Sequence, residues 1–320
     1  MNRRFTSLVF SLGLITVAAL GWTQRNALFD AWRLRGYEPP AQIVQIADET
    51  TMTADARRLF YVYRPELNDK AAFNVNCSGS EQTIVLGCYI KRQGIYLYEV
   101  PDVRLDGVVE VTAAHELLHA EYDRLSVKER ARIDALTQQV ATSIKDERFL
   151  LTIENYRQKD QSVVPNELHS ILATEVRNLP TDLEKYYARY FSSRVTIVDM
   201  AEKYKQAFSE REAEVAAIDT KLASLKSQIE SLNGSLESQQ ASLKNQYDTL
   251  QQQKSSGNVE AYNQGVPQYN QSVNEYNAAV KRQKSLVTEY NQLVERRNGL
   301  AVEENELVKA LDSRETIQTQ

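Results

Sequence analysis

Residues 113–120 read Ala-Ala-His-Glu-Leu-Leu-His-Ala, inside a segment, residues 108–122, that has the pattern of a helix. On a helix, His115 and His119 are about one turn apart and project from the same face. They are two of only three histidines in the chain. The alanines and leucines around them would bury the rest of the helix. The stretch therefore predicts a packed helix that holds two imidazoles side by side.

Two imidazoles at this spacing suit two corners of a tetrahedral zinc site. Glu116 lies beside them, where its carboxylate can take a proton from a water that the metal activates. We therefore interpret His-Glu-x-x-His as a zinc-binding motif with Glu116 as the general base. The alternative is a chance match on an ordinary amphipathic helix, and the clustering of scarce histidines favours zinc.

This motif resembles the active-site helix of the zincin metallopeptidases. The resemblance implies bound zinc, a polarised water and hydrolysis of peptide bonds in a peptide or protein substrate. It also implies a strand beside the helix that lines the substrate cleft, for which residues 95–100 are the candidate. A donor that stabilises the oxyanion is also needed, and the sequence leaves four candidates open: Tyr122, His169, Tyr186 and Tyr187.

The same resemblance suggests a third zinc ligand. Metzincins would need a glycine and a third histidine soon after His119, where this chain continues Ala-Glu-Tyr-Asp-Arg. Gluzincins use a glutamate from a later helix, within Asn-Glu-x-x-small, and residues 166–170 (Asn-Glu-Leu-His-Ser) look like that motif. The resemblance thus makes Glu167 the third ligand, although a predicted helix at 126–144 lengthens the spacing. The alternatives, as ligands or as groups that orient one, are Glu175, His169 and Glu121.

Two segments upstream of the motif have the composition of β-strands. Residues 83–90 and 95–100 are dense in β-branched and aromatic side chains, and residues 91–94 between them are typical of a turn. Helical patterns precede and follow them. We therefore expect residues 41–198 to form a small zincin-like domain of the α+β class.

The composition changes near residue 199. Apolar residues then follow a 4-3 spacing in two series, one starting at Ile218 and the other at Tyr262, with a polar Gly- and Pro-containing stretch between them. This pattern predicts an antiparallel coiled-coil hairpin over residues 199–313, followed by a tail at 314–320. A long parallel dimeric coil is the alternative. Either form could bind a protein partner.

The N-terminal region predicts a location. Residues 5–22 carry no charge and follow two arginines, which predicts a transmembrane helix within an anchor at residues 1–24. A cleaved signal peptide is the alternative. Residues 25–40 would be a juxtamembrane connector, and both interpretations place the remainder outside the cytoplasm. There, Cys77 and Cys88 would form a disulfide; two buried thiols are the alternative.

Composition limits the functions further. The chain has 38 Lys and Arg against 43 Asp and Glu, a net charge of −5, so no binding to nucleic acid is expected. Together, these patterns predict a membrane-anchored, extracytoplasmic zinc peptidase. One alternative is a non-enzymatic envelope protein whose coiled coil does the work and whose zinc site is structural or inactive. Another is a hydrolase of peptidoglycan, or a regulator of one.

Overall fold

The computed structural model describes residues 24–77 and 85–314, which form parts of two compact units. The first unit, which we call the head, comprises Met1–Ala207 and Leu307–Gln320. The second, which we call the hairpin, comprises Phe208–Glu306.

The described chain is mostly helical. Helices make up 76% of it, and it has only three short strands, so the predicted α+β class is wrong. The strands are β1 (Glu66–Asn68), β2 (Gly87–Ile90) and β3 (Gly94–Tyr98), in the order β1-β3-β2. β3 pairs in parallel with β1 and antiparallel with β2. The β-rich sequence therefore makes one small sheet within a helical fold.

The head holds this sheet among helices. The helices before the sequence motif are α2 (Arg25–Leu34), α3 (Ala41–Glu49), α4 (Ala54–Val62), α5 (Lys70–Asn76) and the 3-10 turn η1 (Val103–Leu105). The motif lies on α6 (Val108–Arg124), followed by α7 (Val127–Ala141), α8 (Glu147–Lys159), α9 (Val164–Glu175) and α10 (Thr181–Tyr187). Side chains of Thr53, Asp69, Ser126 and Asp146 accept hydrogen bonds at the starts of α4, α5, α7 and α8, which fixes where those helices begin.

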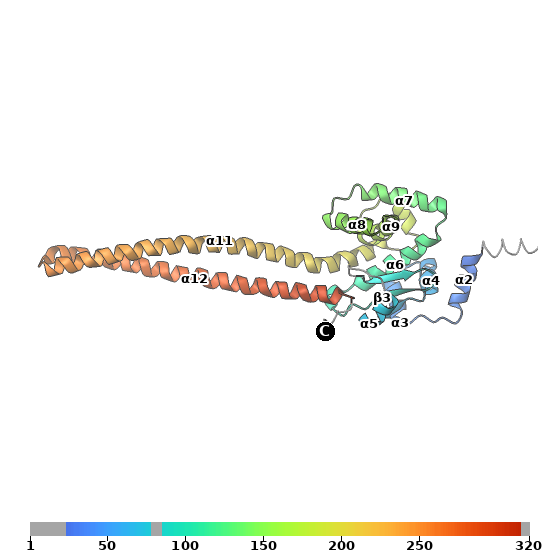
Figure 1. The fold of residues 1–320 in the computed structure, drawn as a ribbon, viewed down its shortest axis with the longest axis horizontal. Helices are drawn as coiled ribbons and strands as arrows, with labels where there is room; N and C mark the ends of the chain where they lie inside the picture. The colour runs from blue at the N-terminus through green and yellow to red at the C-terminus, as the bar shows by residue number, and fades with distance from the viewer. Residues whose placement is uncertain (1–23, 78–84, 315–320) are drawn as a thin grey trace, which may run out of the picture. The chain divides into compact units, whose positions relative to one another are not determined.

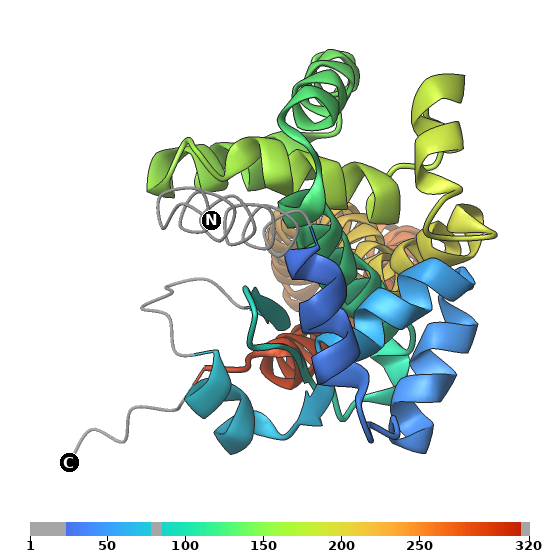
Figure 2. The same cartoon turned by 90° about the vertical axis from the view of Figure 1, so that its right-hand side faces the viewer.

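Helix α6 is the centre of the head. It packs on β2 and β3 and on α3 and α4, and it also packs against α9. In Figures 1 and 2 the helices α3 and α4 and the helices α7 and α8 occupy opposite parts of the head, with α6 between them. Leu117 and Leu118 are fully buried, as are Ala113 and Ala114. This burial fixes the helix on which the two histidines lie.

Two long helices, α11 (Arg194–Ser255) and α12 (Val259–Leu311), run side by side in Figure 1, and the hairpin contains α11 from Phe208 to its end and α12 from its start to Glu306. Their direction is antiparallel, because ion pairs join Arg297 to Asp219 and Lys221 to Glu289. At the reversal, Gly257 adopts a φ of +77°, a conformation that glycine reaches without strain. The heptad series from Ile218 and from Tyr262 lie on these two helices.

Cys77 and Cys88 are joined in a disulfide, with their Cα atoms 6.0 Å apart. The bond ties the end of α5 to β2. Neither cysteine is a free thiol.

The predicted membrane topology needs correction. Among residues 24–77 and 85–314, no helix combines the length and the apolar character that crossing a bilayer requires. The predicted span at residues 5–22 lies outside the described residues. The prediction of a single-pass membrane protein, with the localisation derived from it, is corrected accordingly, because no described helix supports it.

Candidate metal centre

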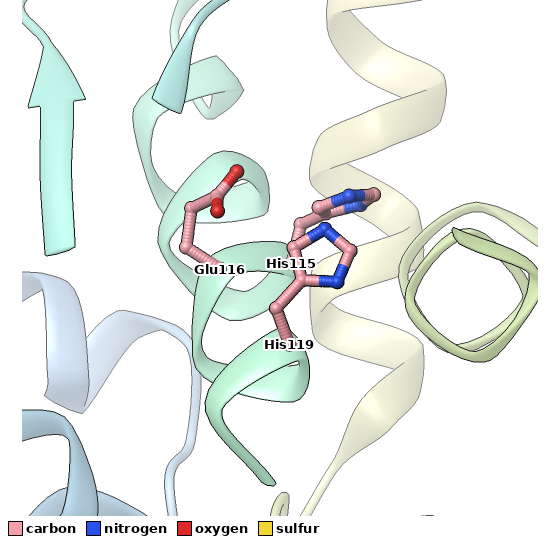
Figure 3. A group of neighbouring side chains, drawn as sticks. All are labelled: His115, Glu116 and His119. Atoms are coloured by element: carbon pink, nitrogen blue, oxygen red, sulfur yellow. The ribbon is translucent and has the colours of Figure 1, made fainter. Parts of the chain in front are cut away.

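His115 and His119 come together on the middle of α6. Their rings lie edge to face with centroids 4.6 Å apart, and the donor atoms of His115, Glu116 and His119 all lie within 4.8 Å of one another. Figure 3 shows the two rings close together, one nearly perpendicular to the other, with the Glu116 carboxylate beside them on the same helix. The local spacing of the motif is enough to produce this pair, since it needs only a regular helix.

Glu167 reaches the pair from the first turn of α9. Its Oε2 lies 3.5 Å from His115 Nε2, and its Oε1 lies 3.6 Å from His119 Nε2. Zinc binds nitrogen and oxygen at about 2.0–2.2 Å, so neighbouring ligand atoms in a tetrahedral site are about 3.4 Å apart. Each of the two separations, which reach different oxygens of the carboxylate, is close to this spacing and longer than a direct hydrogen bond.

The Glu167 carboxylate has the character of a metal ligand. Its Oε2 is buried and has no hydrogen-bond partner within the described residues, which is costly unless a cation satisfies it. Burial by itself would raise the pKa of Glu167. The contact with His115, the electrostatic interaction with both imidazoles and a hydrogen bond from Tyr156 outweigh burial and hold that pKa below its usual value. The carboxyl is therefore held in the anionic form that a cation needs.

Ser170 orients His119. Its Oγ donates a hydrogen bond to the backbone oxygen of Asn166 at 3.2 Å, and it lies 3.2 Å from His119 Nδ1. Because the hydroxyl proton goes to Asn166, the oxygen is left to accept a hydrogen bond from Nδ1. The lone pair of His119 then lies on Nε2, the atom that faces Glu167. Sequence reasoning noted Ser170 only as the small residue of the Asn-Glu-x-x-small pattern and did not find this role.

Glu116 lies beneath the edge strand β2. It is 6% exposed, and a side chain added at Gly87 would come 2.9 Å from Glu116 Cγ and 2.5 Å from Thr112 Cγ2. Only a glycine lets the strand pass this close to the helix. The backbone of β2 thus forms one wall beside the carboxylate.

A cleft of about 590 Å³ contains these groups. Its lining includes His115, His119, Glu116 and Glu167, together with β2 and one face of α8. The strand at the cleft is therefore β2. The predicted strand, residues 95–100, is mostly β3, whose two edges are occupied by β1 and β2. The assignment of the cleft strand to residues 95–100 is corrected for this reason.

The three residues that are alternatives to Glu167 either have other partners or lie outside the cleft. Glu175 lines the cleft but pairs with Lys205, so its carboxylate already has a cation. His169 is fully buried away from the pair, its Nε2 lies 2.9 Å from the Tyr186 hydroxyl, and burial lowers its pKa to about 3. Glu121 lies on α6 outside the set that lines the cleft, and burial raises its pKa to about 7.

The tyrosines proposed as oxyanion donors point elsewhere. Tyr122 donates to Asp134, Tyr187 donates to the backbone oxygen of His169, and Tyr186 bonds within the buried aromatic cluster. Tyr156 on α8 lines the cleft and contacts Glu167 instead. Nothing in the sequence pattern marks Tyr156, because its position depends on how α8 packs over α9.

Comparison of the chain with protein-family models, with curated proteins and with solved structures finds no match in any of the three.

Proposed function

We propose that the chain is a zinc-dependent peptidase in which His115, His119 and Glu167 hold the metal and Glu116 moves the proton. The observation that carries the proposal is the approach of both Nε2 atoms to one carboxylate, at 3.5 and 3.6 Å, inside an open cleft. Bound zinc would act there as a Lewis acid toward water and toward a carbonyl oxygen.

The number of donors favours catalysis over a structural role. Structural zinc sites are normally closed by four protein ligands, whereas catalytic sites use three and leave a position open. In the described chain, the Glu167 carboxylate approaches both His115 and His119, and Glu116 lies beside the two histidines. A structural site has no use for an adjacent carboxylate that can accept a proton.

Each residue of the site has its own role in the proposed reaction. Glu116 accepts a proton from the attacking water and passes it to the leaving nitrogen, as a general base and then a general acid. Ser170 keeps His119 in the tautomer that presents Nε2. The backbone of β2 and the facing side of α8 leave room for a peptide in an extended conformation.

The test combines metal analysis with digestion of a peptide library. We expect wild type and Glu116→Gln to contain about one zinc per chain. We expect wild type to cleave peptides and Glu116→Gln to be slower by about 10²–10⁴-fold, because only the proton transfer is lost. Glu110→Gln, a change on the same helix outside the cleft, is the matched control and should keep full activity.

Two results would contradict the proposal. If His115→Ala and His119→Ala leave the zinc content unchanged, the metal binds elsewhere. If zinc is bound as expected and no peptide is cleaved by wild type, the site is structural or inactive. The function would then lie in the hairpin, as the non-enzymatic alternative has it.

A further inference from the structure

The last described residues of the chain return to the head after α12 ends at Leu311. Ser313 is 3% exposed, and Leu307 on the last turns of α12 is fully buried. Three hydrogen bonds hold this end: Lys70 Nζ donates to the backbone oxygen of Asp312, Asn74 Nδ2 to that of Ser313, and Ser313 Oγ to that of Val85. We call Asp312 and Ser313 the clasp.

The clasp holds a segment that lines the cleft. Residues 85–88, which we call the rim, form part of the cleft wall and include Gly87, whose backbone lies against Glu116. Val85 lies two residues before β2 begins. The nearest backbone bond to the sheet is at Leu86, whose oxygen accepts a hydrogen bond from the Tyr98 N–H, so the Ser313 hydroxyl holds the rim one residue before that bond.

The bonds form a closed circuit. Asn74 on α5 binds Ser313, Ser313 binds Val85 in the rim, and the disulfide from Cys88 to Cys77 leads back to the end of α5. A strand of only four residues at the edge of a small sheet has few ladder bonds of its own. Side-chain links from outside the sheet are then a large part of what fixes its position.

We propose that Ser313 is a positioning residue that sets the distance of the rim from Glu116 and so determines how tightly a peptide is held in the cleft. The second part of this proposal rests on the proposed peptidase function, whereas the first part does not. The metal ligands lie on α6 and α9, not in the rim, so zinc binding is independent of the clasp.

The experiment uses the full chain and three measurements: hydrogen exchange of the amides of residues 85–90, zinc content, and KM and kcat for a cleaved peptide. Loss of one hydrogen bond in Ser313→Ala should speed exchange in the rim and raise KM, each by roughly three- to tenfold. Zinc content and kcat should stay nearly unchanged. Ser313→Thr, which keeps the hydroxyl, should restore slow exchange.

Asn74→Ala gives an independent variant that leaves Ser313 in place. It breaks the circuit at a different bond, so it should have the same effect as Ser313→Ala, and the double variant should be no worse than either single one. Ser238→Ala is the matched control, because that hydroxyl on α11 bonds only to the backbone oxygen of Gly234 within its own helix.

Unchanged exchange in residues 85–90 for folded Ser313→Ala or Asn74→Ala would overturn the positioning role. Faster exchange with an unchanged KM would overturn its link to substrate binding. If wild type cleaves nothing, the peptidase function fails, and the exchange measurement still decides whether the clasp holds the rim.

Discussion

The head and the hairpin each contain buried polar side chains, and two examples show how differently such side chains can be bonded. In the head, Arg194 is 4% exposed, yet its guanidinium donates to the backbone oxygens of Ala173, Val176 and Arg177 and pairs with Glu184. In the hairpin, three glutamines at seven-residue intervals have buried side-chain oxygens without partners in the described chain: Gln239, Gln246 and Gln253.

The two examples differ in how narrowly bonding fixes the positions of the surrounding segments. Partners for a buried polar group must come from fixed directions, so a fully bonded arginine fixes one arrangement of the segments around it. In the hairpin, the amide nitrogens of Gln239 and Gln246 donate to serines on their own helix, but the buried oxygens have no partner in the described chain, which costs stability. A metal centre needs positions accurate to fractions of an ångström, and a fully bonded side chain such as Arg194 shows how the head can provide them.

The largest expected effect is the loss of stability when one core side chain is truncated in each unit. Phe60 is fully buried in the head, and Phe60→Ala should lower the free energy of unfolding of the head by about 3–5 kcal/mol. Leu225 in the hairpin is 1% exposed. Leu225→Ala should lower the free energy of unfolding of the hairpin by about 2 kcal/mol, because two packed helices can move together to fill the gap. Hydrogen exchange resolved by segment measures both. If each change weakens both units equally, the units unfold as one.

Removing the two candidate glutamates separates a metal ligand from a neighbour in the same cleft. Glu167→Ala should weaken zinc affinity by more than about 100-fold, since even groups that only orient ligands contribute about 10–100-fold. Glu175→Ala is the matched control and should leave the affinity nearly unchanged, because Glu175 is already paired with Lys205. Competition with a chromophoric chelator measures both affinities. The reverse order of effects would make Glu175 the ligand.

A smaller change in stability is expected from a buried glutamine of the hairpin. Gln246→Leu replaces a buried oxygen that has no partner by an apolar group, so the hairpin should gain about 1 kcal/mol in stability. Gln251→Leu, an exposed position on the same helix, should change the stability little. Thermal unfolding followed by circular dichroism gives the comparison. Equal or lower stability of Gln246→Leu would show that the amide oxygen has a favourable role in the seam.

The fold class illustrates where sequence reasoning failed. The β-branched and aromatic residues at 83–90 and 95–100 predict strands, and β2 and β3 lie within or close to these ranges. The class was wrong because strand propensity reports only local preference. How many segments join a sheet depends on partners distant in the chain, and here β1 adds only three residues.

The cleft shows the same limit at the level of single residues. A sequence pattern names Glu167, but the closeness of its carboxylate to both imidazoles depends on the packing of α9 against α6. Tyr156, Ser170 and Gly87 acquire their contacts with the site in the same way. The Asn-Glu-x-x-small pattern includes Ser170 but does not predict its contact with His119, and nothing nearby in the chain marks Tyr156 or Gly87.

The sequence by itself determined the features that depend on spacing along one segment. These are the two imidazoles of His115 and His119 on one helix face, and the heptad repeats that lie on α11 and α12. Only the tertiary structure decided which carboxylate faces the imidazoles, which strand borders the cleft, and that Ser313 reaches Val85 across 228 positions. The reason is physical: helical periodicity is set by short-range backbone geometry, whereas contacts between distant segments are set by how buried surfaces fit together.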